Sequence, residues 1–184
     1  EFPDNPFARY ADDAVAHCKT ESEAIHLKER IEKRMLECRL ELHPEKTKIV
    51  YCKDDDRQGN YPNEQFDFLG YTFRARRSKN RYGKFFVNFS PAISNKAAKS
   101  IRQKMRSWQI QKRSDKEIDD LGRMFYAEIN GWINYYGRYY RSALYPIFQH
   151  FNCTLVWWVM RKYKKLRGHQ RKATHWLGRV AARE

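Results

Sequence analysis

The chain has 184 residues, of which 41% are hydrophobic, and this is enough for one large domain or two small ones with a core. Its 37 Lys and Arg residues against 22 Asp and Glu give a formal net charge of +15, which predicts a polyanionic partner, either nucleic acid or an acidic membrane surface. No run approaches the roughly 18 to 20 apolar residues of a membrane-spanning helix, so we expect a soluble intracellular protein. A membrane partner is not expected, because the Trp and Tyr residues interleaved in the basic helices fit a bundle interior better than a single lipid-facing stripe.

The four cysteines argue against a zinc module. Cys18, Cys38, Cys52 and Cys153 include no C-x-x-C pair, and we expect reduced structural thiols.

The positive charge is concentrated in the second half of the chain. Residues 1–92 carry 17 basic and 16 acidic side chains, whereas residues 93–184 carry 20 and 6. We therefore expect two domains with these bounds, joined by a linker at residues 91–95, whose composition suits a loop.

The first half is expected to pair antiparallel strands with one helix. Asp12 and Asp13 lie between two short strand-like runs and suit a tight hairpin turn. Thr20 and Glu23 form a capping box for an amphipathic helix that runs to about Leu40. The expected strands cover residues 7–10, 14–17, 47–53, 66–77 and 84–89.

From residue 93 onward the apolar residues recur with a helical period. One helix is expected over residues 97–108, and a second is expected to be capped by Ser114 with Glu117. A third pattern passes into the basic run 161–167 and is expected to end at Gly168, before a short last helix. The predicted fold class is α+β: antiparallel strands with one helix, then an all-α bundle.

Two adjacent carboxylates at a turn are the sharpest chemical feature of the first half. Like charges this close repel and raise each other's pKa unless a cation neutralises them, and hard oxygen ligands favour Mg²⁺. Two such ions can activate a 3′-hydroxyl and stabilise leaving pyrophosphate in phosphoryl transfer. For this tetrapeptide alone, a solvated Asp-Asp turn remains the alternative.

Four motifs follow one another along the chain. They are Tyr10-Ala11-Asp12-Asp13, Leu42-His43-Pro44-Glu45-Lys46-Thr47-Lys48, Phe68-Leu69-Gly70-Tyr71 and Gly131-Trp132-Ile133-Asn134-Tyr135-Tyr136-Gly137. In this order they resemble the YADD box, the next palm motif, the primer-grip strand and the maturase signature of the reverse transcriptases encoded by group II introns. The resemblance implies that residues 1–92 are the C-terminal part of a polymerase palm and that residues 93–184 are the helical maturase region, also called thumb or X. It places the protein in the bacterial cytoplasm or, in a eukaryote, in an organelle.

The resemblance also implies ligands and roles. Mg²⁺, an RNA template, a DNA primer, a deoxynucleoside triphosphate and group II intron RNA would be bound. Asp12 and Asp13 would be the catalytic metal ligands, and Lys46 would lie near the triphosphate and donate a proton to pyrophosphate. The residues expected to border nucleotide and primer are Tyr10, Ala11, Phe68, Leu69, Gly70 and Tyr71. A solvated Lys46 and a core strand at residues 68–71 are the alternatives.

The second half supplies candidate RNA contacts, because stripes of cations neutralise phosphates and exposed rings stack on bases. At helical spacing, however, most of the aromatic residues are expected to pack the core, and only one or two would reach RNA. The residues expected to contact RNA are Lys96, Lys99, Arg102, Arg106, Trp132, Tyr135, Tyr136, Arg161, Lys162, Lys164, Lys165 and Arg167.

The family has fingers and an earlier palm strand with another catalytic aspartate, whereas this sequence begins a few residues before the YADD box. We therefore expect the C-terminal part of a larger polymerase that needs this N-terminal segment as a partner. The expected function is RNA-directed DNA polymerisation together with intron-RNA binding in splicing and retrohoming. A non-catalytic RNA-binding maturase and an inactive remnant remain alternatives, although Asp12 and Asp13 favour polymerase ancestry.

Overall fold

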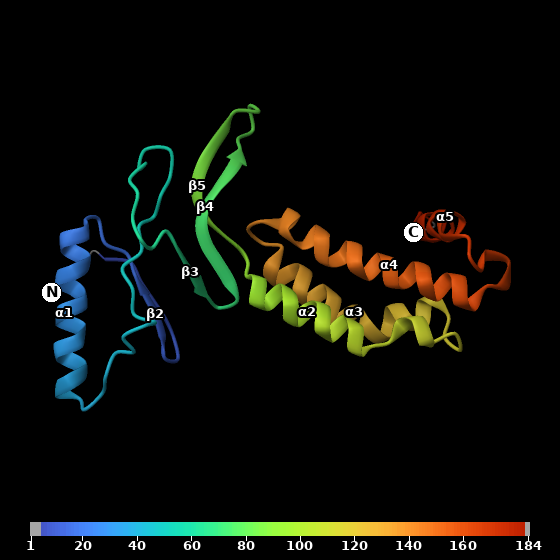
Figure 1. Cartoon of the computed structure of the whole chain (residues 1–184), viewed down its shortest axis with the longest axis horizontal. Coiled ribbons are helices and arrows are strands. Elements are labelled where there is room, and N and C mark those ends of the chain that lie inside the picture. The colour runs from blue at the N-terminus through green and yellow to red at the C-terminus, as the bar shows by residue number, and fades with distance from the viewer. Residues whose placement is uncertain (1–4, 183–184) are drawn as a thin grey trace. The chain divides into compact units, whose positions relative to one another are not determined.

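The computed structural model describes residues 5–182 and has the α+β architecture that the sequence predicts (Figure 1). The strands are β1 (Phe7–Tyr10), β2 (Asp13–Ala16), β3 (Gln65–Phe68), β4 (Tyr71–Lys79) and β5 (Phe85–Ile93). The α-helices are α1 (Glu21–Glu37), α2 (Asn95–Ser107), α3 (Ile118–Tyr136), α4 (Tyr145–Lys162) and α5 (Gln170–Ala181). Short 3-10 helices are η1 (Ile110–Lys112), η2 (Arg141–Leu144) and η3 (Lys164–Leu166).

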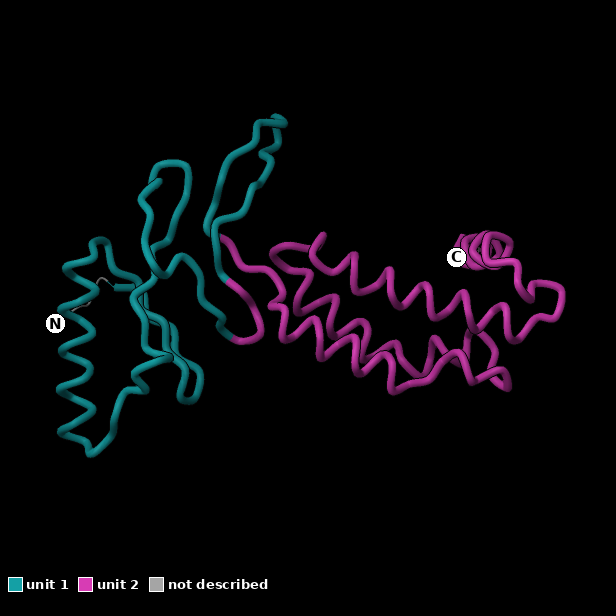
Figure 2. The backbone as a smooth tube through the Cα atoms, in the orientation of Figure 1, with its two compact units in different colours: residues 1–68, 73–89 teal, residues 69–72, 90–184 magenta. Residues whose placement is uncertain are grey.

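The described chain forms two compact units (Figure 2). Unit 1 contains residues 5–68 and 73–89, and unit 2 contains residues 69–72 together with 90–182. The four-residue segment 69–72 therefore belongs to the helical unit, although in sequence it lies between β3 and the rest of β4. Leu69, Gly70 and Tyr71 of this segment belong to the motif Phe68-Leu69-Gly70-Tyr71.

In unit 1, β1 and β2 form an antiparallel hairpin in which Tyr10 pairs with Asp13. Helix α1 begins where the capping box predicts. The Thr20 hydroxyl accepts a hydrogen bond from the Glu23 amide at 3.2 Å, and the Glu23 carboxylate accepts one from the Lys19 amide at 2.7 Å. Together these bonds satisfy two amide groups at the N-terminal end of the helix.

The strand predicted at residues 47–53 is wrong, because this segment has no regular structure. Its backbone bonds beyond the local turns are both to Asn63: the Tyr51 amide donates to the Asn63 carbonyl oxygen at 2.8 Å, and the Ile49 carbonyl oxygen accepts from the Asn63 side-chain amide at 3.4 Å. The Tyr51 ring stacks on Tyr61, with centroids 4.3 Å apart. The side chains of this segment alternate as in a strand. A strand also needs a ladder of backbone hydrogen bonds to a neighbouring strand, and the segment is irregular because it lacks that ladder.

Unit 1 has no buried hydrophobic side chain among its described residues. Along α1, Ile25 remains 44% exposed and Leu36 64% exposed. The sheet of β3, β4 and β5 contributes local aromatic packing, including Phe66 stacked on Phe73 with centroids 4.8 Å apart. The burial of apolar side chains, which is the main stabilising contribution to a fold, is therefore concentrated in unit 2.

Unit 2 is a helical bundle in which α2, α3 and α4 lie side by side and α5 follows at one end (Figure 1). Trp158, Ile110, Ile147 and Val159 are fully buried at its centre. The other buried members of the same core are Ile93, Ala98, Ile101, Met105, Trp108, Leu121, Phe125, Leu144, Val156 and Ala173. Within residues 5–182, no helix combines the length and apolar character required to cross a membrane.

The single strand expected at residues 66–77 is instead two strands, β3 and β4, separated by a turn at Leu69 and Gly70. Three other expected boundaries differ from the structure. The linker predicted at residues 91–95 is instead the end of β5, a buried N-cap and the start of α2; the Ser94 hydroxyl accepts a bond from the Ala97 amide at 3.1 Å. Helix α3 begins after Glu117 rather than Ser114, and the Glu117 amide donates to the Asp120 carboxylate at 3.1 Å. Helix α4 ends at Lys162, before η3, and Gly168 turns the chain towards α5 with φ of +74°. Serine and acidic residues are good caps at several neighbouring positions, so pattern alone misplaces the helix start.

Candidate metal and nucleic-acid site

The YADD motif forms the tip of the β1–β2 hairpin. Ala11 and Asp12 are the two turn residues between the paired Tyr10 and Asp13. Ala11 has φ of +50°, a left-handed conformation that costs an L-residue roughly 1–2 kcal/mol. The Arg9 guanidinium donates to the Ala11 carbonyl oxygen at 3.0 Å across this turn. The expected hairpin is present, but its turn lies one residue earlier than predicted: Ala11 and Asp12 form the turn, and Asp13 is the first residue of β2. Both carboxylates still lie at the tip of the hairpin.

Asp12 and Asp13 are both exposed, and neither forms an ion pair with a described Lys or Arg. Their oxygens are the ligand type that Mg²⁺ prefers, so the two residues suit part of a magnesium shell. No group of three or more His, Cys, Asp or Glu residues within 5–182 is arranged to hold a metal. The hairpin thus offers two of about six octahedral ligands, and water, substrate phosphate or other protein groups would have to provide the rest.

Lys46 lies in the turn that follows α1. The Lys46 and Thr47 amides both donate to the His43 carbonyl oxygen, at 3.2 and 2.9 Å. The Lys46 side chain is exposed and has no ion-pair partner among the described residues. The structure thus leaves its ammonium group accessible to an anion and records no contact with Asp12 or Asp13.

The primer-grip motif contains a two-residue hairpin turn between β3 and β4. Leu69 has φ of +50° and Gly70 has φ of +79°, the signs that a type I′ turn requires at both central positions. The Leu69 carbonyl oxygen accepts from the Tyr135 hydroxyl at 2.9 Å, and the Gly70 carbonyl oxygen accepts from the Ser94 amide at 2.9 Å. Both turn carbonyls are therefore bonded to residues of the helical part of unit 2.

Tyrosine side chains of α3 surround the same turn. The Tyr71 hydroxyl donates to the Tyr135 carbonyl oxygen, and the Tyr71 side chain is only 7% exposed. Burial, followed by the neighbouring Tyr135, Tyr139 and Tyr136 hydroxyls, raises the pKa of Tyr71 to about 12. A Cβ atom at Gly70 would lie 2.8 Å from the Tyr136 hydroxyl oxygen. The absence of a side chain at Gly70 therefore leaves space for the Tyr136 hydroxyl of α3. The family resemblance had implied that this space admits the primer backbone.

The exposed face of α2 is basic. Four of its cations are free of ion pairs among the described residues, whereas Lys104 lies 3.6 Å from Glu128. Helix α2 contains no acidic residue at all. The four are Lys96, Lys99, Arg102 and Arg106. A face of this kind attracts a polyanion.

The second basic segment spans the end of α4 and η3, where Arg161, Lys164, Lys165 and Arg167 are exposed. Lys162 differs from its neighbours and corrects the expectation that every cation of this run faces RNA. Its ammonium donates to the Ser114 and Lys116 carbonyl oxygens at 3.2 and 2.7 Å and lies 2.8 Å from the Glu117 carboxylate. Only 12% of the side chain is exposed, so Lys162 ties α4 to the start of α3.

The aromatic residues of the maturase motif pack mainly inside unit 2. Trp132 stacks on Trp108 with centroids 5.6 Å apart, and Tyr136 is partly buried beside the core. Tyr135 is 47% exposed, yet its hydroxyl is bonded to the Leu69 carbonyl oxygen. One or two rings at most therefore retain an accessible face.

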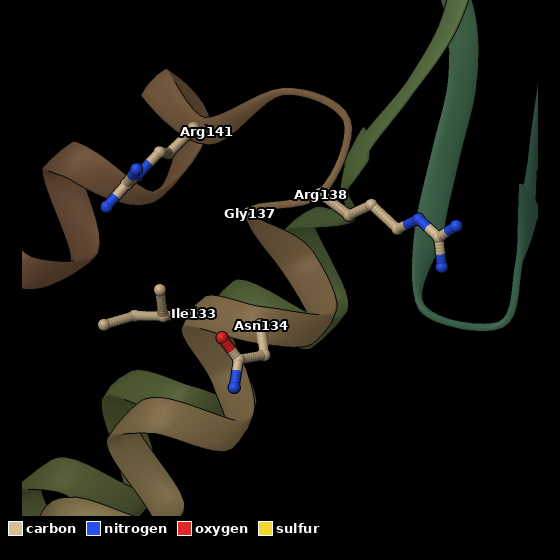
Figure 3. A pocket seen from close by; sticks show the side chains of 5 residues that line it. All are labelled: Ile133, Asn134, Gly137, Arg138 and Arg141. Atoms are coloured by element: carbon tan, nitrogen blue, oxygen red, sulfur yellow. The ribbon is translucent and has the colours of Figure 1, made fainter.

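A hollow of about 300 Å³ lies where α3 ends and η2 begins (Figure 3). Its lining residues are Ile133, Asn134, Gly137, Arg138 and Arg141. The two guanidinium groups point in different directions, so they do not converge on a single ligand (Figure 3).

Sequence reasoning missed several exposed cations. Arg138 and Arg141 flank a tyrosine pair directly after the maturase motif, and Arg171 and Lys172 lie on α5. Their signal was present, because residues 129–183 contain no acidic side chain at all. Counting that absence of acids would have extended the expected basic surface to Arg138 and Arg141 and beyond residue 167.

Comparison with protein families identifies the chain. Residues 1–73 match the model of the reverse transcriptase (RNA-dependent DNA polymerase) family, and residues 98–176 match the group II intron, maturase-specific domain. Palm-like strands followed by a basic helical bundle define a reverse transcriptase segment joined to a maturase domain. The chain belongs to the group II intron reverse transcriptase/maturase family. Searches of curated proteins and of solved structures found no match.

Proposed function

We propose that this chain takes part in RNA-directed DNA synthesis and that Asp12 and Asp13 bind the catalytic Mg²⁺. The observation that carries the proposal is the exposed carboxylate pair at the hairpin tip, free of described cations, within a segment that matches reverse transcriptases. Carboxylates without an internal cation carry unscreened charge that a divalent ion would neutralise. When bound, Mg²⁺ would activate the primer 3′-hydroxyl and neutralise charge on the triphosphate.

The other palm residues would orient the substrates. Tyr10 is 64% exposed beside the carboxylates, and together with Ala11 it would border the incoming nucleotide and the primer end. The exposed Lys46 ammonium would attract the triphosphate and protonate leaving pyrophosphate. The turn at Leu69 and Gly70 would contact the primer strand, whereas the buried Tyr71 would support that turn from within.

The bundle would bind intron RNA and assist splicing and retrohoming. Accessible cations on α2, on α4 and on η3 would contact phosphates, and we include Arg138, Arg141, Arg171 and Lys172 in this surface. Lys162 and Trp132 are left out of the proposed contacts because they are engaged inside unit 2. In this proposal the polymerase domain comprises residues 1–92 and the maturase domain residues 93–184.

A second candidate function is RNA binding without catalysis. Every buried hydrophobic residue of the described chain lies in unit 2, whereas unit 1 has none. The bundle therefore has the core of a self-sufficient RNA-binding module, and unit 1 would need further strands to cover its exposed apolar side chains. The polymerase proposal accordingly includes an upstream fingers and palm segment that contributes another aspartate.

The test is primer extension on an RNA template by the chain joined to that upstream segment. We expect extension that requires Mg²⁺, and we expect Asp12→Asn to reduce it at least about a hundredfold, the scale of losing a group that stabilises transition-state charge. Asp56→Asn is the matched control, because Asp56 is an exposed carboxylate in another loop of unit 1. Full extension by the Asp12→Asn protein would remove this residue from the mechanism. RNA binding without any extension by the unsubstituted protein would support the second candidate.

A further inference from the structure

The turn at Leu69 and Gly70 differs from an ordinary sheet turn because one of its carbonyl groups, that of Leu69, is bonded to a helix, while that of Gly70 continues the pairing of β4 with β5. The Tyr135 hydroxyl donates to Leu69 and the Ser94 amide donates to Gly70, each at 2.9 Å. Ser94 is itself the N-cap of α2 and is 3% exposed. Tyr135 lies on α3 and Ser94 joins β5 to α2, and both belong to unit 2, as the turn itself does. The bond from α3 therefore ties the turn to the bundle.

The contact between turn and helix is reciprocal. Tyr71 donates from its hydroxyl to the Tyr135 backbone, while Tyr135 donates from its hydroxyl to the Leu69 backbone. The two rings lie 5.2 Å apart, and the Tyr71 ring lies 5.4 Å from Tyr136 and 5.7 Å, edge-on, from Tyr139. Because each residue satisfies a backbone carbonyl of the other element, shifting the turn would break both bonds at once.

Tyr136 limits the position of the turn from another side. Its hydroxyl oxygen occupies the space that a side chain at residue 70 would fill, 2.8 Å from the position of a Cβ atom. Gly70 also has φ of +79°, so glycine is required there both by conformation and by space. The neighbouring Leu69, at φ of +50°, is held in a conformation that an unsupported leucine avoids. Strain of this kind persists only where the surroundings enforce it.

We propose that Tyr135 and Tyr136, expected from sequence to bind RNA, are positioning residues for the primer strand: they fix the Leu69–Gly70 turn on the helical bundle, so that the bundle sets where the primer is held. This inference rests on the proposed polymerase function. It adds to that function a specific mechanical link between the maturase motif and the primer-binding turn.

The first experiment uses Tyr135→Phe, which removes one hydroxyl and keeps the ring. In the chain itself, we expect the backbone amides of residues 69–72 to exchange with deuterium faster, while the buried core of the bundle keeps its protection. In the extension-competent protein, we expect the KM for primer–template to rise about three- to tenfold, the size of one lost hydrogen bond, with the KM for nucleotide unchanged. A mere loss of folded protein would lower the maximal rate and leave both KM values unchanged.

The matched control is Tyr126→Phe. Tyr126 lies on the same helix, is 67% exposed, and its hydroxyl has no partner in the part of the chain that the structure describes. It should behave like the unsubstituted protein in both measurements. Unchanged exchange at residues 69–72 or an unchanged primer KM in Tyr135→Phe would overturn the inference. Absence of extension by the unsubstituted protein would instead overturn the proposed function, and the primer role of the turn with it.

The second experiment tests the packing of Tyr136 against Gly70. Gly70→Ala should raise the primer KM because the new Cβ meets the Tyr136 hydroxyl, and Tyr136→Phe in the same protein should restore part of the loss by removing that oxygen. Gly83→Ala is the control: Gly83 also has a positive φ, +83°, but its nearest neighbour would be a flexible lysine carbon at 3.5 Å. If Gly83→Ala raised the primer KM equally, or if Tyr136→Phe gave no recovery, Tyr136 would have no positioning role.

Discussion

At the scale of single residues, the buried Tyr71 hydroxyl links stability to pH. Its pKa lies at about 12, whereas an unfolded tyrosine titrates near 10. The folded state thus favours the protonated phenol, which is also the form that donates to the Tyr135 carbonyl oxygen. A raised folded-state pKa contributes stability that is fully present below pH about 10 and is lost as the pH rises towards 12.

We therefore expect the free energy of unfolding to fall between about pH 10 and about pH 12, and to fall less steeply in Tyr71→Phe. Urea unfolding at several pH values would measure this slope. Tryptophan fluorescence is a suitable probe, because all five tryptophans lie beyond residue 107, in unit 2. Tyr126→Phe is the control, because it removes a hydroxyl from an exposed ring in the same unit. Equal slopes for Tyr71→Phe and the unsubstituted chain would contradict the assignment of this titration to Tyr71.

At the scale of elements, α4 presents adjacent tryptophans to opposite environments. Trp158 is fully buried and donates from its indole nitrogen to the Arg113 carbonyl oxygen at 2.8 Å, whereas Trp157 is 54% exposed. Residue 113 follows η1, which packs against α4. One side chain therefore fills the core and also bonds the loop that precedes α3.

Trp158→Phe should lower the free energy of unfolding by about 2–4 kcal/mol, because it leaves a cavity and removes the shorter of the two hydrogen bonds to the Arg113 carbonyl oxygen, which keeps only the Lys116 amide at 3.2 Å. Trp157→Phe makes the same chemical change one residue away and should shift stability by no more than about 0.5 kcal/mol. Urea denaturation followed by far-ultraviolet circular dichroism compares them without depending on tryptophan emission. Similar losses in the two variants would show that the indole bond and the burial of Trp158 are unimportant.

The elements that sequence predicts well are those whose signals are local. The capping box at Thr20 and Glu23 and the hairpin turn at Asp12 are defined by a few neighbouring residues, and both are present. The strand at residues 47–53 fails because alternation cannot reveal whether a partner strand exists. The linker at residues 91–95 fails for a related reason, since Ser94 caps a helix and also bonds the distant Gly70.

The same difference between local signals and distant partners decides which residues of the candidate site could be predicted from sequence. Exposure of Asp12, Asp13 and Lys46 follows from their turns, which local sequence specifies. Lys162 could not be distinguished from its basic neighbours by pattern, because its partners lie some 45 residues earlier in the chain. The tyrosines of the maturase motif were correctly expected to pack in part, but the bonds that join Tyr135 to Leu69 and Tyr71 span more than 60 residues and leave no local signal.

At the scale of the whole molecule, charge and core are concentrated in the same half of the chain. Residues 93–184 carry 20 basic and 6 acidic side chains, and the described core also lies in the helical unit. A rigid scaffold that carries many exposed cations releases counterions when it binds nucleic acid, so its affinity must depend steeply on salt. The exposed Lys99 is expected to contribute to this salt dependence, whereas the largely buried Lys162 is not.

We expect the affinity of the full chain for structured RNA to fall as KCl rises, giving a straight line of log affinity against log salt. Lys99→Gln should reduce the slope by about one, because one phosphate contact is lost. Lys162→Met keeps the aliphatic stem and should leave the slope unchanged while lowering the free energy of unfolding by about 1–3 kcal/mol, since the Ser114 and Lys116 carbonyl groups lose their donor. Fluorescence anisotropy across a KCl series and urea denaturation provide the two measurements. A reduced slope in Lys162→Met with unchanged stability would show that this ammonium reaches RNA and that its bonds to the start of α3 are dispensable.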